Sequence, residues 1–376
     1  MRGALVKRLS LVALVAALSV TPAVTPAVAH AQPAVAHAQP AVDPQVALDS
    51  YRTTAGGPGA ALHTHSRTLH SGSASITENR PITPDDRFRA ASQTKTFTAV
   101  AVLQLVDDGS VDLDATVERY LPGVVTGNGH DGTKITVRQV LQNTSGITSS
   151  TSDPQPQPDG TYTLRELVRA GLTTPPRTAP GTAFEYSNTN FALAGLLVEQ
   201  VTGRSIGDVI TARIIAPLGL TRTEYPRSRS MAAPFVPGYQ GGRLGPFFFW
   251  LDRTDSVEPS FIASAGAIVS SQRDLSTFQR ALLDGRLLSP STLRQMRTTV
   301  PMPGVPADSR YGLGLWRLAL TCGGEAWGHF GDLSTGHSSG TFATDDGRVA
   351  ALVTNTIVLT EPATTRIQVI DAALCA

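Results

Sequence analysis

Lysine is scarce in this chain of 376 residues: only Lys7, Lys95 and Lys134 are present, and the other Lys/Arg-type cations are all arginines. Arginine cannot replace lysine where an amine must lose its proton, because the pKa of a guanidinium is far too high. A chain that otherwise uses arginine for positive charge therefore draws attention to its few lysines. Lys95 is the one that stands beside a potential nucleophile, Ser92.

An excess of positive charge is also lacking. The formal net charge is +1, and removing the three cations of the first eight residues leaves about −2. The sequence has no arginine-rich run or basic patch, which are the usual signs of a nucleic-acid-binding surface. We therefore expect no nucleic-acid partner.

Long apolar runs are absent as well. The longest candidate, Leu9 to Val20, follows the cations Arg2, Lys7 and Arg8 and is too short to span a bilayer. This order is typical of a secretory signal peptide, with Ala-His-Ala cleavage sites ending at Ala31 or Ala38. The segment Pro-Ala-Val-Ala-His-Ala-Gln occurs at 26–32 and again at 33–39, as in a low-complexity spacer. We interpret 1–38 as signal peptide and spacer, and expect a secreted protein without a stable membrane span.

Cysteine is limited to Cys322 and Cys375. In an exported protein an isolated pair most simply forms one disulfide. No cluster of Cys and His has the spacing of metal ligands, and His63 and His65, which would face one side of a strand, are too few for a site. We expect neither a metal nor a cofactor.

Strand patterns stand at both ends of the sequence, and helical patterns lie between them. We expect helices at 44–56, 92–107, 136–141, 163–170, 191–201, 271–283 and 362–374, and strands at 60–69, 72–77, 311–316, 336–343 and 349–354. This order predicts an α/β or α+β fold with one antiparallel sheet built from both chain ends. The sheet lobe would comprise about 44–108 and 262–376, and a mostly helical inserted lobe about 109–261.

Two segments have no regular pattern. Residues 143–160 are rich in Ser, Thr, Pro and Asp, and are either a functional rim or a disordered excursion. Residues 226–258 are irregular and contain the aromatic cluster Phe247 to Trp250. We interpret this cluster as packing against the core, with a pocket wall as the alternative.

Ser92 and Lys95 lie three residues apart at the start of the apolar run 99–106. If the run is helical, it is buried on all sides, and the two side chains share one face. A hydroxyl beside an amine at the positive end of a helix is a plausible activated nucleophile. The spacing alone is weak, because Ser-x-x-Lys occurs by chance in many chains.

Two further motifs make the signal specific. Ser92-Gln93-Thr94-Lys95 is followed by Tyr186-Ser187-Asn188 and then by His329-Phe330-Gly331. In this order they resemble the Ser-x-x-Lys, Tyr-x-Asn and His/Lys-x-Gly motifs of the penicillin-recognising serine hydrolases. Over residues 44–376 the chain is most similar to the secreted actinomycete-type D-alanyl-D-alanine carboxypeptidases, which are relatives of the class C β-lactamases. The resemblance implies a β-lactamase-like fold.

The resemblance also implies roles for the motif residues. Ser92 would form an acyl-enzyme, and Lys95 and Tyr186 would move its proton, with a Lys-assisted tyrosinate as the base. A tyrosine can serve as base only if neighbouring cations lower its pKa, and Lys95 and His329 are the candidates. Asn188 would position Lys95 and the substrate amide.

The third motif would supply the substrate strand. Main-chain N–H groups of Ser92 and Asp332 would bind the oxyanion, and Gly331 would let the substrate lie against the strand edge. The relatives are expected to bind a free terminal carboxylate here, through an arginine and the hydroxyl of His-Thr-Gly. This chain has Trp316, Phe330 and Asp332 at the corresponding positions, which removes or opposes anion binding. We expect Trp316 and Phe330, together with Phe261, to line an apolar pocket.

The default function is therefore that of a D-alanyl-D-alanine carboxypeptidase acting on peptidoglycan-type peptides. The alternative is an esterase, an amidase or a β-lactamase of the same fold, and a non-catalytic penicillin-binding sensor is an alternative of another class. We expect a monomer whose partners are small peptides, esters or β-lactams, and peptidoglycan itself.

Gly336-His337-Ser338-Ser339-Gly340 also matches the Gly-x-Ser-x-Gly elbow of α/β-hydrolases. That elbow needs a following helix and a later histidine. No histidine follows His337, and the next residues are typical of strands. We reject this reading.

Overall fold

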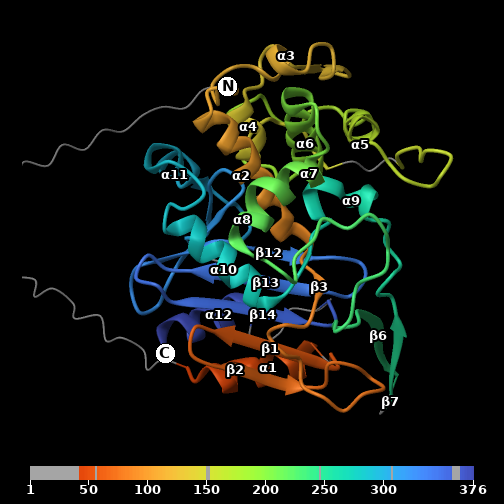
Figure 1. Cartoon of the computed structure of the whole chain (residues 1–376), viewed down its shortest axis with the longest axis vertical. Helices are drawn as coiled ribbons and strands as arrows, with labels where there is room; N and C mark the ends of the chain where they lie inside the picture. Colours follow the sequence, from red (N-terminus) through yellow and green to blue (C-terminus); the bar gives the residue numbers. More distant parts are fainter. Residues whose placement is uncertain (1–41, 56, 150–152, 245–246, 306–307, 358–364) are drawn as a thin grey trace, which may run out of the picture. The chain divides into compact units, whose positions relative to one another are not determined.

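The architecture centres on one eight-stranded antiparallel sheet in the order β2-β1-β14-β13-β12-β11-β10-β9 (Figure 1). A computed structural model describes residues 42–55, 57–149, 153–244, 247–305, 308–357 and 365–376. The predicted signal peptide and spacer, 1–38, lie outside these residues. The strands are β1 (Gly59–Thr64), β2 (Thr68–Gly72), β9 (Val300–Pro301), β10 (Arg310–Tyr311), β11 (Trp316–Ala319), β12 (Glu325–Asp332), β13 (Ser338–Ala343) and β14 (Val349–Thr354).

The sheet joins the two ends of the described chain. Strand β1 pairs antiparallel with β14, with Ala60 opposite Thr354, and β14 continues to β13 and β12. The predicted mixed α/β fold with an antiparallel sheet built from both chain ends is confirmed. Three two-stranded sheets accompany it: β3 (Phe88–Arg89) with β8 (Val269–Ser270), β4 (Thr126–Gly127) with β5 (His130–Asp131), and β6 (Tyr239–Leu244) with β7 (Phe247–Asp252).

Helices cover both faces of the large sheet. They are α1 (Pro44–Ala55), α2 (Thr94–Asp107), α3 (Val117–Tyr120), α4 (Val137–Leu141), α5 (Leu164–Gly171), α6 (Asn188–Thr202), α7 (Ile206–Ile210), α8 (Ala216–Leu218), α9 (Pro259–Gly266), α10 (Gln272–Leu283), α11 (Pro290–Met296) and α12 (Arg366–Cys375). A 3₁₀ turn η1 (Ala91–Gln93) precedes α2, and a π-helical turn η2 (Thr211–Ile215) precedes α8.

The two faces of the sheet carry separate apolar clusters. Helices α1 and α12 pack on one face, where Leu48 and Ile370 are fully buried with Phe342 of β13. On the other face, α10 contacts β13 and β14, and α2 is enclosed by α6, α9 and α7. Helix α2 is apolar nearly all round and is buried along its length, as the sequence predicts for a central helix.

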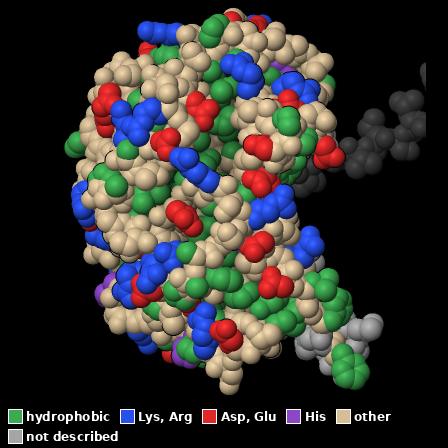
Figure 2. Space-filling view, turned by 45° about the vertical axis from the view of Figure 1, so that its right-hand side comes forward, with side chains coloured by type: hydrophobic (Ala, Val, Ile, Leu, Met, Phe, Trp, Pro, Cys, Tyr) green, Lys and Arg blue, Asp and Glu red, His purple; other side chains and the backbone are tan. Residues whose placement is uncertain are grey.

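The segment 226–258 differs from its prediction. Residues 239–244 and 247–252 pair as the strands of the β6–β7 hairpin, and the Phe249 ring lies against Gly242. Phe247 is 74% exposed and Phe249 is 53% exposed. Figure 2 shows hydrophobic side chains on the surface of this hairpin. The interpretation of the aromatic cluster as core packing is therefore wrong for these two residues.

A disulfide joins Cys322, in the turn after β11, to Cys375 at the end of α12, with an S–S distance of 2.01 Å. Among the described residues, no helix is both long enough and apolar enough to cross a bilayer. The same part of the chain holds no group of three His, Cys, Asp or Glu side chains placed to bind a metal.

Candidate active site

Ser92 lies in the 3₁₀ turn η1, immediately before α2, and not within the α-helix that the sequence predicts. The preceding residue, Ala91, has a positive φ of 50°, which is uncommon for a residue with a side chain. A Cβ atom on Gly331 of β12 would lie 2.2 Å from the carbonyl oxygen of Ala90 and 3.0 Å from the nitrogen of Ser92. Glycine at 331 thus lets the strand approach the Ser92 turn, a structural reason that is distinct from the predicted contact with substrate.

Lys95 is fully buried below Ser92, and its Nζ has three oxygen partners. The distances are 3.0 Å to Oγ of Ser92, 2.7 Å to Oδ1 of Asn188 and 2.9 Å to the carbonyl oxygen of Ala265. No carboxylate contributes to these contacts, so burial is uncompensated and lowers the pKa of Lys95 to about 7. Near neutral pH the amine therefore exists in both protonation states.

Tyr186 is a second hydrogen-bond partner of the Ser92 hydroxyl. The Nζ of Lys95 lies 4.8 Å from the centre of the Tyr186 ring. Burial raises the pKa of the Tyr186 phenol well above its usual range, and the nearby Asp332 carboxylate acts in the same direction. This is the reverse of the expectation that neighbouring cations lower the pKa of Tyr186 and make it the base.

His329 does not supply the expected positive charge. Burial, and then the charge of Lys95, lower the pKa of His329 to about 3, so the ring is neutral. Its Nδ1 contacts the carbonyl oxygen of Phe330, and its Nε2 lies 3.2 Å from the Tyr311 hydroxyl. Because a carbonyl can only accept, Nδ1 carries the proton and Nε2 accepts from Tyr311. His329 is thus turned toward Tyr311, beside Tyr186.

Asn188 is the first residue of α6, a helix capped by the side chain of Ser187, which accepts from the main-chain N–H of Asn190. The cap fixes the helix start, and with it the amide that faces Lys95. The main-chain N–H of Asn188 donates to Oγ of Ser149, 2.9 Å away. The segment 143–160 therefore contributes to the rim of the site through Ser149, which the sequence pattern left open.

Strand β12 borders the Ser92 turn. Strand β11 pairs with β12 only as far as Trp316 opposite Gly328, so the last residues of β12 have a free edge on that side. The main-chain N–H of Leu333 donates to His337 on the β13 side. Because successive amides of a strand point to opposite edges, the N–H of Asp332 points away from β13, toward the free edge beside Ser92.

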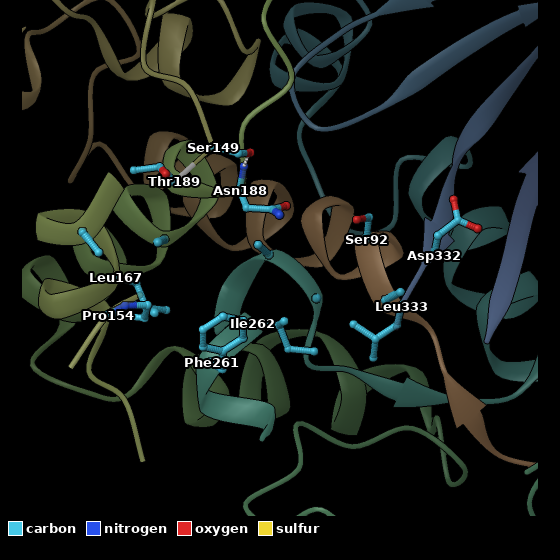
Figure 3. A pocket seen from close by; sticks show the side chains of 15 residues that line it. Ser92, Ser149, Pro154, Leu167, Asn188, Thr189, Phe261, Ile262, Asp332 and Leu333 are labelled. Atoms are coloured by element: carbon cyan, nitrogen blue, oxygen red, sulfur yellow. Dashed lines mark hydrogen bonds between the residues drawn. The ribbon is translucent and has the colours of Figure 1, made fainter. Parts of the chain in front are cut away.

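A cavity of about 190 Å³ opens beside Ser92 (Figure 3). Its wall comes from α5, α6, α9 and the 143–160 segment, and Figure 3 shows Leu167, Phe261, Ile262 and Leu333 around it. The fifteen lining residues are Ala91, Ser92, Ser149, Pro154, Leu167, Ala170, Asn188, Thr189, Ala192, Phe261, Ile262, Ala265, Gly266, Asp332 and Leu333. Asp332 is the single charged residue among them, and Figure 3 shows its carboxylate directed away from the cavity.

Of the three predicted pocket residues, only Phe261 lines this cavity. Phe330 is buried on the α1 and α12 face of the sheet, where its ring packs on Phe342. Since His329 faces α2, the side chain of the next residue on the strand must face the other way. Trp316 packs on Phe330 and His329, outside the cavity. The assignment of Trp316 and Phe330 to the pocket is therefore wrong.

The sequence reasoning missed other contributors. The carbonyl of Ala265 accepts from Lys95, and the kink of α9 at Ala263, with φ of 32°, sets the direction of this segment. Ser338 to Gly340 of the Gly-x-Ser-x-Gly segment lie in β13, and the buried Oγ of Ser339 accepts a hydrogen bond from Nε2 of Gln93. This placement agrees with its rejection as a nucleophile elbow.

In this site a buried amine is hydrogen-bonded to a serine hydroxyl, at the edge of an antiparallel sheet and beside a helical lobe. This is the arrangement of a penicillin-recognising serine hydrolase. The sequence matches the Beta-lactamase family over residues 38–374, and the chain belongs to this family of serine hydrolases.

Relatives of known structure include a D-stereospecific amidohydrolase from Streptomyces sp., at 41% identity and a TM-score of 0.77, covering 88% of this chain and 98% of that one. A D-amino acid amidase from Ochrobactrum anthropi SV3, complexed with L-phenylalanine amide, has 30% identity and a TM-score of 0.74, with 88% and 97% coverage.

Curated relatives include penicillin-binding protein 4 of Amycolatopsis lactamdurans, 28% identical over 342 residues, which are 83% of this chain and 84% of that protein. Protein flp of Staphylococcus aureus is 31% identical over 157 residues, or 42% of this chain. The matched part spans about a third of that relative's length, 32%.

Proposed function

We propose that the protein is an amidase that forms an acyl-enzyme at Ser92 and cleaves amides of amino acids with an apolar side chain. The observation that carries the proposal is the cavity beside Ser92, whose fifteen lining residues include no lysine, arginine or histidine. A peptide with a free carboxylate next to the scissile bond would find no counter-charge there. The similarity to a D-stereospecific amidohydrolase and to a D-amino acid amidase supports amide substrates and the D configuration.

Lys95 is the general base in this proposal. As an ammonium it donates to Ser92, Asn188 and the carbonyl of Ala265. As a neutral amine it keeps two N–H groups, which donate to Oδ1 of Asn188 and to the carbonyl oxygen of Ala265. Its lone pair then points to the Ser92 hydroxyl and can accept the proton. A pKa of about 7 makes this neutral form available at physiological pH.

Tyr186 then acts as a neutral phenol. Its raised pKa keeps the proton on the hydroxyl, which hydrogen-bonds Ser92. From there it can pass a proton to the leaving amine while it receives one from Lys95, so that the phenol is never left charged. The main-chain N–H groups of Ser92 and Asp332 would stabilise the oxyanion of the tetrahedral intermediate.

A comparison of substrates tests the proposal. D-phenylalanine amide, L-phenylalanine amide, a short p-nitrophenyl ester and a diacyl-lysyl-D-alanyl-D-alanine peptide are offered to the wild-type protein and to Ser92→Ala. We expect D-phenylalanine amide to be hydrolysed with the highest kcat/KM and the Ser92→Ala variant to be inactive on all four. Release of D-alanine as the fastest reaction would instead establish a carboxypeptidase.

Mass spectrometry after incubation with a β-lactam provides the independent control. The acyl-enzyme chemistry predicts a covalent adduct on Ser92 that disappears in Ser92→Ala. If no acylating substrate or β-lactam leaves an adduct and none is turned over, the chain is a binding module and the proposal is wrong.

We also infer that the signal peptide is removed after Ala31 or Ala38 during export and that the mature protein is an extracellular monomer. The disulfide between Cys322 and Cys375 supports an oxidising compartment. N-terminal sequencing of protein from the culture medium should begin at Gln32 or Gln39. Recovery of the full-length chain from the cytoplasm alone would contradict export, and light scattering would test the monomer.

A further inference from the structure

Arg366, the first residue of α12, holds the end of strand β12. Its Nη1 lies 2.7 Å and 2.6 Å from the two carboxylate oxygens of Asp332, the last residue of that strand. The guanidinium also stacks 4.4 Å from the ring centre of Phe330, and Nη1 lies 3.4 Å from Oγ of Ser338 on β13. One side chain thus contacts β12 at two residues and the adjacent strand at a third.

The helix that carries Arg366 is itself fixed at its other end. Cys375, the last residue of α12, is bonded to Cys322 in the turn that joins β11 to β12. Between the two ends, Val369, Ile370 and Leu374 are buried against the sheet. Arg366 therefore reaches Asp332 from a rigid support.

The residue that Arg366 holds is the one whose main-chain N–H faces Ser92. Pairing with β11 stops at Gly328, so one edge of β12 is unsupported from His329 onward. On the opposite edge β12 stays paired with β13 through Asp332 and Ser338, and the Leu333–His337 main-chain hydrogen bond follows in the turn. The strand end beside the nucleophile therefore has a paired strand on one edge only, and the Arg366 contacts are made at this point.

We propose that Arg366 is a positioning residue, whose ion pair with Asp332 holds the main-chain N–H of Asp332 at the oxyanion position opposite Ser92. The inference rests on the proposed acyl-enzyme function. A single oxyanion donor is worth roughly 10²–10³ in kcat, and a displacement of about 1 Å is enough to forfeit much of it. A partly exposed ion pair, in contrast, contributes little to folding.

The chain offers a matched control on the same strand. Arg317 pairs with Glu325, the first residue of β12, at 2.7 Å between Nε and Oε1. The side chains are 22% and 40% exposed in that pair, against 28% and 41% for Arg366 and Asp332. The two ion pairs have similar exposure and join the same strand, but only one lies beside Ser92.

The experiment compares Arg366→Ala, Asp332→Asn and Arg317→Ala with the wild type, using p-nitrophenyl ester hydrolysis and thermal unfolding. We expect the first two variants to lose about tenfold to a hundredfold in kcat, with KM changed less than about threefold. Arg317→Ala should keep kcat within about twofold, and all three should unfold within a few degrees of the wild type. Guanidinium chloride at millimolar concentration should restore part of the activity of Arg366→Ala, while sodium chloride at equal ionic strength should not.

Three outcomes would overturn the inference. The first is a kcat for Arg366→Ala equal to that of Arg317→Ala. The second is a rise in KM at constant kcat, which would make Arg366 a substrate-binding cation. The third is an activity loss that only follows a fall in Tm and resists guanidinium. Each is distinct from failure of the proposed function, in which Ser92→Ala would keep its activity or no acyl-enzyme would form in the wild type.

Discussion

The Nζ of Lys95 lies 3.0 Å from Oγ of Ser92, inside a shell of neutral partners. Burial without a counter-ion lowers the pKa of Lys95 to about 7. If the neutral amine is the base, kcat/KM should rise with pH from 5 to 8 with a midpoint near 7, because protonated Lys95 is inactive. A profile of p-nitrophenyl ester hydrolysis, with the pH-dependent background of Ser92→Ala subtracted, measures this limb. A flat profile between pH 5 and 8 would exclude Lys95 as the base.

The same lowered pKa destabilises the folded protein. An unfolded lysine keeps its proton up to its usual pKa, 10.5, whereas buried Lys95 loses it near 7. Between these values the unfolded chain binds more protons, so the free energy of unfolding increases with pH through this group. The cost is largest at and below pH 7 and vanishes above about 10.5.

Replacing Lys95 with methionine should therefore stabilise the protein while it abolishes hydrolysis. We expect a gain of up to about 5 kcal/mol in the free energy of unfolding at pH 6, reduced by the lost hydrogen bonds, and a smaller gain at pH 9.5. Urea unfolding of Lys95→Met and wild type at both pH values measures the difference. A gain in the free energy of unfolding that is smaller at pH 6 than at pH 9.5 would contradict the assignment.

The apolar cavity should set the size of the accepted side chain. Ala170 of α5 lines it, and Ala170→Leu adds three carbon atoms to the wall. We expect kcat/KM for phenylalanine amide to fall about tenfold or more, while that for alanine amide changes little, since the smaller side chain leaves room. Alanine amide is the internal control for folding and chemistry. An equal loss on both amides would mean that the cavity does not hold the substrate side chain.

The disulfide should contribute to stability without contributing to the chemistry. Closing the loop between Cys322 and Cys375, 53 residues apart, is worth roughly 4 kcal/mol by the loop-entropy estimate. The double variant Cys322→Ser/Cys375→Ser should lower the free energy of unfolding by up to that amount, and dithiothreitol should shift the melting of the wild type but not of the variant. Equal melting temperatures with and without reductant would show that the bond has no stabilising role.

Short-range motifs predict most of the site because their spacing fixes their geometry. Ser92 and Lys95 are three residues apart before a buried helix, and Asn188 begins a helix that Ser187 caps. Asn188 meets Lys95 only through tertiary packing, but the family resemblance supplies that contact. The antiparallel sheet from both ends was likewise predictable, since strand patterns occur at both ends of the sequence.

The wrong or missing predictions concern the face of a strand on which a side chain lies, or a partner that is distant in the sequence. Placing Phe330 in the pocket neglects strand alternation, because His329 already occupies the face toward α2. The β6–β7 hairpin was missed because Gly241 and Gly242 interrupt the strand pattern. The contact of Arg366 with Asp332 spans 34 residues and depends on how α12 packs, which no local pattern encodes.

The pairing of β1 with β14 also sets the point in synthesis from which the sheet can form. Ala60 is synthesised long before Thr354, and until β14 emerges strand β1 lacks this partner. The Ser92 turn similarly packs against Gly331, which is synthesised much later. A nascent chain that already contains Ser92, Lys95 and Tyr186 therefore has no oxyanion strand, and such long-range pairing is slow to form. A chain terminated before β12 would therefore carry the three catalytic side chains without the strand that completes the site.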